Sequence, residues 1–376
     1  MKNFTYINIL LMLIILLVGC NTVGNDSIKG GTQKADRYKL EVKGVDNVDV
    51  LDTHGGVEGW EQMQGFYDNI QNGIASDLRI VHYTIEGAPI VTDLTYNGES
   101  LEVKNDYSRD TYGSGEIITN KCGNMVKEAN DTNLSYIAID CNGIPYGMDT
   151  ILQISYDSSE QDLFEFELMY GEELENEINT LTKQAKKEIT VNETEVMADF
   201  DLPPHIKQEV FNRLVFANYL AEKDLKAMCD IEDIMNYQLK VHINSGQRVF
   251  RWAACDQSVD GVKLTEVAEY IIEQSDKKQS VEPEIKVQGY VLEMTKDTML
   301  IVEEINMLDF EWIKVELPQS DMNSFVFDFT NLEGVNTTEF SIGDKVQATL
   351  KGTVRGSKPG SANVKEIKKI EINAND

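Results

Sequence analysis

The first twenty residues constrain this chain most, because they determine the compartment in which the rest of it folds. A positive start, Met1-Lys2, precedes an unbroken apolar run from Ile9 to Val18. An apolar run of about ten residues is too short to span a bilayer, which takes about twenty. A positive start, a short apolar core and a small residue at position 19 are typical of an export signal. We therefore expect residues 1–19 to be removed and the mature chain to fold outside the cytoplasm.

The residue after the predicted cleavage site is a cysteine. The segment Leu17-Val18-Gly19-Cys20 resembles the lipobox of bacterial lipoproteins. The resemblance implies cleavage between Gly19 and Cys20, a diacylglycerol on the Cys20 thiol, and anchoring on the outer face of the cytoplasmic membrane of a Gram-positive bacterium. The alternative is an ordinary secretory signal in which Cys20 is incidental. Residues 20–38 are polar and glycine-rich, and we expect them to form a flexible tether.

The remaining cysteines are consistent with an oxidising compartment. The chain has five cysteines, so lipidation of Cys20 leaves an even number. The other four form two local pairs, Cys122 with Cys141 and Cys229 with Cys255. Outside the cytoplasm such pairs persist as disulfides, and we predict both bridges. The alternative is four buried, reduced thiols. We expect no metal site and no cofactor, because no C-x-x-C or C-x-x-H spacing accompanies the cysteines.

Composition excludes one class of partner. The chain has 64 acidic and 34 basic residues and a net charge of -30. Nucleic-acid binding depends on Lys and Arg that neutralise phosphates, so we expect no nucleic-acid partner. The acidity is explained by solubility at a crowded membrane or, alternatively, by a cationic partner or divalent ions. With 376 residues, 41% of them hydrophobic, the chain is expected to fold into two or three domains.

The predicted fold class is α+β, with two small α+β units of antiparallel sheets and helices, followed by a small β-barrel. The predicted boundaries are 39–158 for the first unit, 159–279 for the second α/β unit and 284–376 for the barrel. In the first unit, apolar residues at helical spacing run from Trp60 to Ile74, and Asn97-Gly98 lies between two alternating runs. These patterns predict a helix and a β-hairpin, respectively.

The second unit is predicted to combine helices with a hairpin. Acidic residues precede apolar ones spaced by three or four from Gly171 to Lys187, which predicts a helix there. Pro203-Pro204 begins a second predicted helix, because proline is tolerated in the first helical turn. A hairpin is predicted around Asn244-Ser245-Gly246, and a closing helix carries Leu264, Val267 and Ile271.

The C-terminal part shows several short alternating segments, a pattern that suits a small closed barrel. The predicted strands are 286–292, 299–302, 313–317, 340–348 and 362–367.

Two stretches resemble known families. His54-Gly55, the run from Arg79 to Ile90, Asp93 to Gly98, and Arg109 to Gly113, together with Cys122 and Cys141, resemble a domain of unknown function found in envelope lipoproteins of Bacillus and relatives. This likeness covers about residues 45–157 and implies a compartment and a fold but no activity. One departure is Ala88, where an acidic residue is expected.

The C-terminal part carries the second resemblance. Gly289-Tyr290-Val291, Ile342 to Val346, and Lys358 to Ala362 resemble a small exported Bacillus family, the YobA-like group. That resemblance implies an OB-like barrel without known activity.

No motif assigns catalytic residues. The sequence has no nucleophile elbow, phosphate-binding loop or HExxH segment. The weak interaction candidates are His54, in a predicted turn, and Arg251 with Trp252 on the second arm of the hairpin. For His54 a turn-stabilising role competes with a chemical one, and for Trp252 core packing competes with a role as a recognition anchor.

The expected function is therefore non-enzymatic. We predict a membrane-anchored binding or adaptor module for an unidentified envelope protein or cell-wall ligand. The alternatives are an envelope hydrolase with a carboxylate/His site and a divalent-cation-binding envelope protein.

Overall fold

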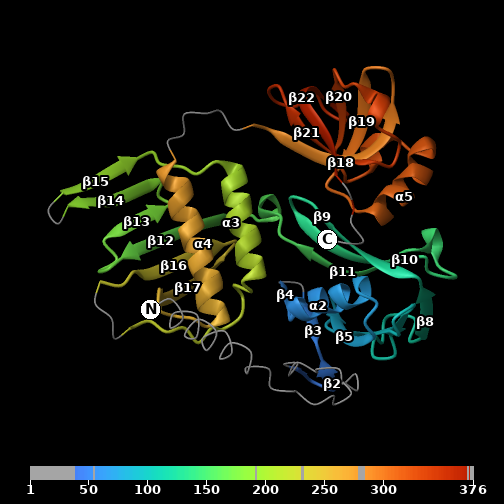
Figure 1. Ribbon diagram of the computed structural model, residues 1–376, viewed down its shortest axis with the longest axis horizontal. Coiled ribbons are helices and arrows are strands. Elements are labelled where there is room, and N and C mark those ends of the chain that lie inside the picture. Colours follow the sequence, from blue (N-terminus) through green and yellow to red (C-terminus); the bar gives the residue numbers. More distant parts are fainter. Residues whose placement is uncertain are drawn as a thin grey trace, which may run out of the picture. The chain divides into compact units, whose positions relative to one another are not determined.

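The computed structural model describes residues 39–53, 56–190, 193–229, 233–277, 284–370 and 372. The predicted signal peptide, Cys20, the tether to residue 38 and His54 lie outside these residues. From Lys39 onward the chain belongs to one compact unit, so contacts among its sheets are part of one fold. The class is mixed α+β, as predicted, and most of the regular structure is sheet (Figure 1). No helix in the described part of the chain is long and apolar enough to cross a membrane.

The first large sheet has six strands in the order β4-β3-β5-β6-β7-β8. Strands β3 and β5 run parallel, whereas the other neighbours are antiparallel. The hairpin predicted at Asn97-Gly98 is confirmed, since it joins β6 to β7 and Gly98 has a φ of 98°, which glycine adopts readily. A separate two-stranded sheet pairs β1 with β2. The bounds are β1 (Leu40–Val42), β2 (Val45–Val48), β3 (Val50–Thr53), β4 (Gly56–Glu58), β5 (Ser76–Tyr83), β6 (Pro89–Tyr96), β7 (Leu101–Asp106) and β8 (Ile117–Cys122).

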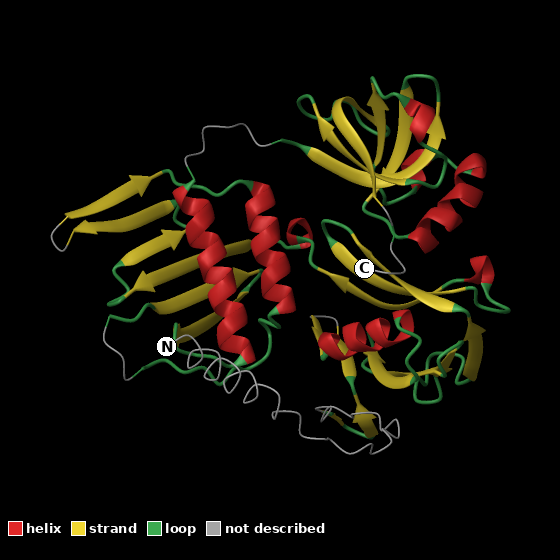
Figure 2. Cartoon of the chain, viewed as in Figure 1, coloured by secondary structure: helices red, strands yellow, loops and turns green. Residues whose placement is uncertain are grey.

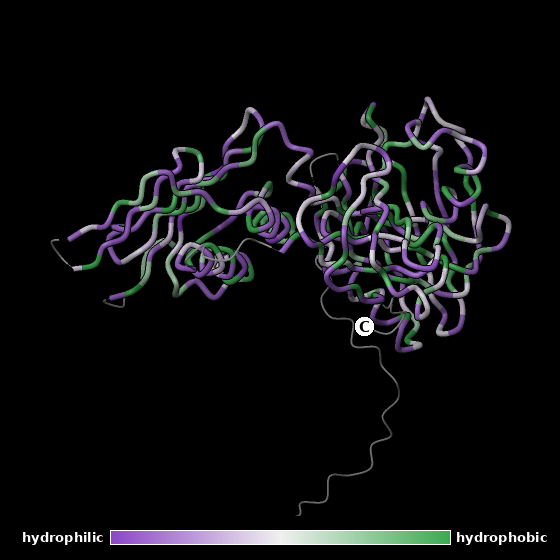
Figure 3. The backbone as a smooth tube through the Cα atoms, turned by 90° about the horizontal axis from the view of Figure 1, so that it is seen from above, coloured by the Kyte–Doolittle hydropathy of each residue, from purple (hydrophilic) through white to green (hydrophobic). Residues whose placement is uncertain are grey.

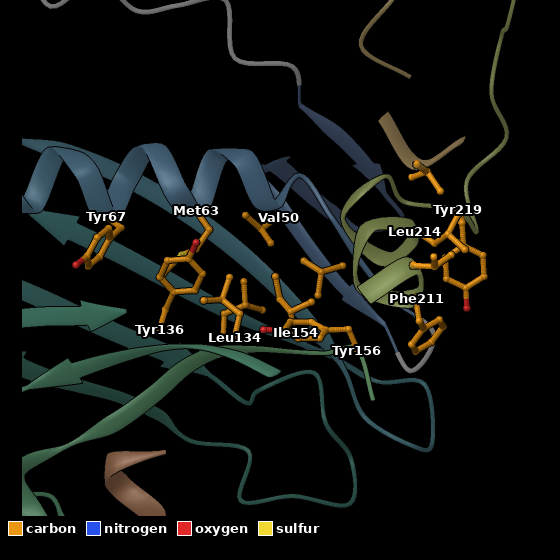
Figure 4. Packing of buried hydrophobic residues seen from close by; sticks show 14 of the residues in the cluster. Val50, Met63, Tyr67, Leu134, Tyr136, Ile154, Tyr156, Phe211, Leu214 and Tyr219 are labelled. Carbon is orange, nitrogen blue, oxygen red and sulfur yellow. The ribbon is translucent and has the colours of Figure 1, made fainter. Parts of the chain in front are cut away.

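A helix and a second sheet pack against the first sheet and form the N-terminal core. The predicted helix is confirmed as α2 (Trp60–Gln71), but Ile74 lies beyond its end and is 48% exposed. The second sheet has the order β11-β10-β9, with bounds β9 (Asn124–Ala129), β10 (Asn133–Ile139) and β11 (Asp149–Ser155). Met63 and Tyr67 of α2 face this sheet, and the rings of Tyr67 and Tyr136 meet edge-on with centroids 5.9 Å apart (Figure 4).

Both predicted disulfides are present. Cys122 ends β8 of the first sheet and Cys141 follows β10 of the second, so this bridge links the two layers that enclose the N-terminal core. Cys255 lies shortly after β17 (Gly246–Ala253) and is bonded to Cys229, which precedes β16 (Asn236–Ile243). The second bridge therefore closes the base of the predicted hairpin, whose two arms pair along their full length.

The middle of the chain forms an antiparallel sheet of six strands in the order β15-β14-β13-β12-β16-β17. Hydrophobic and hydrophilic residues alternate along its strands (Figure 3), as in β12, where every second side chain is buried. The two predicted helices after Pro203-Pro204 and around Leu264 are confirmed as α3 (Pro204–Phe216) and α4 (Val259–Asp276), and they lie side by side across one face of the sheet (Figure 2). The remaining bounds are β12 (Phe164–Gly171), β13 (Asn176–Asn179), β14 (Gln184–Thr190) and β15 (Glu193–Ala198).

The helix predicted from Gly171 to Lys187 is wrong, because this segment forms β13 and β14. A spacing of four residues places side chains on one face of a helix, but it is also two strand periods. Ile178 and Ala185, which belong to the predicted helical face, are instead cross-strand partners with buried side chains. Lys183 has a positive φ of 54°, so the backbone turns there and cannot continue as a helix.

The C-terminal sheet closes on itself in the order β18-β19-β20-β22-β21, which gives the predicted ring of five short strands. The predicted strand at 313–317 is wrong, because these residues end helix α5 (Met307–Glu316) and begin the following turn. Asn306 and Asp309 form a reciprocal capping box that starts this helix, a stronger signal than five alternating residues. The fifth strand is β20, which sequence reasoning missed. The bounds are β18 (Lys286–Met294), β19 (Thr298–Glu303), β20 (Phe329–Glu333), β21 (Lys345–Leu350) and β22 (Gly360–Ile370).

Short 3-10 turns complete the described chain. They are η1 (Pro145–Gly147), η2 (Ser158–Glu160), η3 (Leu317–Gln319), η4 (Met322–Ser324) and η5 (Thr337–Glu339).

Candidate functional site

The core-facing side chains of the first sheet change from apolar to polar toward one end of the sheet. The apolar cross-strand pairs are Leu94–Val103 on β6 and β7 and Val50–Ile80 on β3 and β5. Two residues further along the same strands, the pairs are Thr92–Asn105 and Asp52–His82. Residues two apart on a strand share a face. The sequence therefore places polar side chains where continued core packing would require apolar ones.

Asp52 and His82 form the best-defined pair in this region. The Asp52 Oδ2 and His82 Nδ1 atoms are 2.9 Å apart, and both side chains are partly buried. A carboxylate only accepts hydrogen bonds, so Nδ1 of His82 donates to Asp52, and in that tautomer Nε2 is the acceptor of the ring. The parallel pairing of β3 with β5 holds the two residues opposite each other.

A second chain of polar contacts leads to Asp149 at the start of β11. The hydroxyl of Thr92 donates to Oδ1 of Asn105 at 2.7 Å, which fixes the orientation of that amide. Burial raises the pKa of the Asp149 carboxyl, against the smaller lowering effects of the Asn105 hydrogen bond and the charge of His82. Burial also raises the pKa of the Tyr107 hydroxyl, and the negative charge of Asp149 adds to that effect. These groups therefore share one partly desolvated environment.

The polar side chains line a cavity of about 210 Å³, which we call the His82 pocket. Its lining residues are His82, Ile90, Thr92, Asn105, Tyr107, Asp149, Thr150 and Ile151. Small-molecule sites combine apolar walls with a few placed polar groups, and this pocket has both. In the described part of the chain, no group of three or more His, Cys, Asp or Glu side chains is arranged to hold a metal ion.

A larger cavity of about 440 Å³ adjoins the same pair of residues. It lies between the end of β3, strand β11 and helix α3, and Asp52, Gln153 and Tyr219 are among its lining residues. Because Asp52 lines this cavity and His82 lines the pocket, the hydrogen-bonded pair borders both spaces.

The candidates predicted from sequence do not gather at this site. Trp252 is 1% exposed, its ring stacks on Tyr237 with centroids 5.1 Å apart, and its Nε1 donates to Thr265 at 2.9 Å. Trp252 therefore packs in the core of the middle sheet. Arg251 is exposed and donates from Nε to the Gln238 side chain at 2.7 Å. Cys20 and His54 lie outside the described residues.

A buried ion pair joins the N-terminal core to the C-terminal closed sheet. Nζ of Lys345 on β21 lies 2.7 Å from Oε1 of Glu128 on β9, and the two side chains are 1% and 2% exposed. The Glu128 carboxylate also accepts from the Tyr290 hydroxyl at 2.8 Å and from the backbone N–H of Met307 at 2.9 Å. Lys345 Nζ also donates to the Ala129 carbonyl at 3.2 Å and to the side chain of Asn130, so both charged groups have hydrogen-bond partners, as a buried charge requires.

A neighbouring carboxyl belongs to the same junction. The hydroxyl of Thr132 donates to Oε2 of Glu304 at 2.9 Å, and the side chain of Asn133 donates to the Glu304 carbonyl at 3.3 Å. Burial raises the pKa of Glu304 to about 7. The negative charge of Asp131, in the loop between β9 and β10, adds to this effect.

Sequence reasoning missed both the pocket and the junction. No local spacing in the sequence connects His82 to Asp52, 30 residues earlier. The sequence does contain polar residues at strand positions that face the core. They can be recognised as core-facing only when the register of the strands is known.

Two family models match parts of the chain. Residues 47–137 match a domain of unknown function, DUF4362, and residues 288–371 match a protein of unknown function, DUF3221. A comparison with curated proteins found no match. The matched regions fit the two resemblances predicted from the residues. Asp52, His82 and Glu128 lie in the first matched region, and Tyr290 and Lys345 lie in the second. The chain is thus similar to two families whose descriptions state no activity.

Proposed function

We propose that this protein is a lipid-anchored binding module of the cell envelope, and that the His82 pocket takes a small polar group of an envelope ligand. The observation that carries the proposal is the pocket itself, where His82, Thr92, Asn105 and Asp149 replace apolar side chains at the end of a closely packed core. Polar groups in such positions weaken the core unless they are paired. Their gathering around one cavity favours a ligand.

In this proposal the other parts of the chain place and support the pocket. Lipidated Cys20 anchors the protein on the outer face of the cytoplasmic membrane of a Gram-positive bacterium, and residues 20–38 act as the tether. The envelope address rests on the Leu17-Val18-Gly19-Cys20 segment and on the resemblance of residues 45–157 to a domain of Bacillus envelope lipoproteins. The C-terminal closed sheet is an OB-type barrel, and the buried Glu128–Lys345 pair supports its acting together with the N-terminal core.

A hydrolase is the second candidate, because a carboxylate that orients an imidazole is the arrangement of a general base. The 2.9 Å contact between Asp52 and His82 favours it. A hydrolase also needs a nucleophile or an activated water. The pocket lining offers only the hydroxyls of Thr92, Tyr107 and Thr150, and Thr92 already donates to Asn105. Release of soluble fragments from purified cell walls, abolished in His82→Ala, would decide for this function.

The anchored binding module is tested by chemical cross-linking in living cells. Four versions are compared: the wild type, Cys20→Ala, His82→Ala, and Glu102→Gln as a control on the exposed side of β7. We expect one reproducible envelope component to be captured by the wild type and by Glu102→Gln, and to be lost in Cys20→Ala and in His82→Ala. An alkyne-labelled fatty acid should mark every version except Cys20→Ala. The same captured components from all four versions would contradict the proposal.

A further inference from the structure

The chemistry of the His82 pocket restricts what it can bind. Several of its polar groups can accept hydrogen bonds: the Asp149 carboxyl, Nε2 of His82 in the tautomer that donates from Nδ1 to Asp52, and the hydroxyl oxygens of Tyr107 and Thr150. The Asn105 amide and the Thr92 hydroxyl are already engaged with each other. A complementary ligand group therefore brings several donors.

Charge restricts the ligand further. The lining residues include a carboxylic acid but no Lys or Arg. Burial of the Asp149 carboxyl disfavours its charged form, and a positive ligand group beside it would offset that cost. Coordination of a metal ion fits less well, because no group of three ligating side chains is arranged for it in the described residues.

The size of the pocket sets the scale of the bound group. Sites for whole drug-sized ligands occupy about 300–1,000 Å³, whereas this pocket measures about 210 Å³. It therefore takes a head group with a short stem. Ile90 and Ile151 supply apolar walls that an aliphatic stem can contact.

We propose that the His82 pocket binds a primary ammonium group on a short aliphatic stem, presented by an envelope component. An ammonium has three donors and one positive charge, which matches the acceptors around His82, Tyr107 and Asp149. The inference rests on the proposed function, because it names the ligand class of the same pocket.

The test uses the mature chain with ¹³C-labelled isoleucine methyl groups, so that Ile90 and Ile151 report from the pocket walls. n-Propylammonium chloride is titrated against n-propanol, sodium chloride and calcium chloride at matched ionic strength. We expect saturable shifts of both signals with propylammonium alone. Asp149→Asn should weaken this binding at least about tenfold, because it removes a charge-assisted hydrogen bond. Glu102→Gln, which makes the same change on the exposed side of β7, should leave it unaltered.

Each other outcome overturns the inference in a distinct way. Equal saturation by propanol shows that the pocket takes a neutral group, so the ligand class is wrong and the binding function stands. Saturation by calcium shows a cation site that is not selective for ammonium. No saturation by any probe overturns the inference, and if His82→Ala also captures the same components in cells, the proposed function fails as well. The comparison of probes needs no variant, so it decides even if Asp149→Asn does not fold.

Discussion

Lys345 and Glu128 are 217 residues apart in sequence, and Nζ of the lysine lies 2.7 Å from Oε1 of the glutamate in a fully buried ion pair. Removal of a single partner from such a pair leaves an uncompensated charge in a low-dielectric site, which is far more destabilising than loss of an exposed pair. The junction between the N-terminal core and the C-terminal closed sheet therefore depends on both residues.

Lys345→Met should destabilise the protein by about 3–5 kcal/mol, because Glu128 stays buried without its partner. The control is Lys365→Met, which breaks an exposed Lys–Glu pair with Glu284 and should leave the free energy of unfolding nearly unchanged. Urea unfolding followed by circular dichroism measures both. The double variant Lys345→Met/Glu128→Leu should lose less than Lys345→Met alone. Equal effects of the two lysine changes would show that the buried pair does not hold the junction.

Glu304 makes the same junction sensitive to pH. Burial raises its pKa from 4.5 to about 7, so the folded protein binds a proton that the unfolded chain releases between these values. The stabilisation from Glu304 is fully present below about pH 4.5 and is lost as the pH rises through 7. Between pH 5 and pH 8 its size is about 2 kcal/mol, after allowance for partial exposure.

Glu304→Gln should therefore flatten the dependence of unfolding free energy on pH in this window and should stabilise the protein at pH 8. Thermal unfolding in a series of buffers from pH 5 to pH 8 measures the slope. Glu293→Gln, an exposed carboxyl on β18, is the matched control and should leave the slope as in the wild type. A slope that survives in Glu304→Gln would assign the pH dependence to another group.

The bridge between Cys229 and Cys255 should stabilise the middle sheet by about 3 kcal/mol in the chain-entropy model. Its loop covers a sequence separation of 26 residues, and Trp252 lies buried three residues before Cys255. The fluorescence of the double variant Cys229→Ala/Cys255→Ala should therefore shift to the red at lower urea concentration than in the wild type. Addition of a reductant should not change the urea concentration at which the middle sheet of this variant unfolds. A further loss of stability on reduction would show that another bridge stabilises this sheet.

Local patterns in the sequence predicted the elements that have local causes. The hairpin at Asn97-Gly98 and the helices α2, α3 and α4 follow from turn residues, helix starts and helical periodicity. The helix predicted from Gly171 to Lys187 is wrong because apolar residues four apart share a face of a strand as well as of a helix. The disulfide pairs were predictable because each is local in sequence and because the expected compartment is an oxidising one.

The candidate site was not predictable, because its geometry depends on contacts between distant segments. Asp52 contacts His82 only because β3 and β5 pair in parallel. Asp149 lies on β11, which belongs to the second sheet. Single-residue patterns carry no information about such pairings until the register is known. The Glu128–Lys345 pair is the extreme case, since its partners come from the two regions that match separate families.

The start of α2 offers a test of close packing with a built-in control. Gly59 caps the helix with a φ of 77°, and a Cβ added there would lie 2.2 Å from the carbonyl oxygen of Asp49. Gly44, in the turn between β1 and β2, has nearly the same φ of 78° but open space around the added atom.

Gly44→Ala should therefore destabilise the protein by about 1 kcal/mol, the strain of a left-handed backbone alone. Gly59→Ala adds a clash with backbone that cannot move without disturbing the buried strand residue Val50, and we expect a loss of about 3 kcal/mol or more. Thermal unfolding of the two variants beside the wild type measures the difference. If both alanines lower the midpoint of thermal unfolding equally, the backbone angle alone requires glycine at position 59. A larger fall for Gly59→Ala shows that the close contact between the α2 cap and Asp49 fixes where the helix begins.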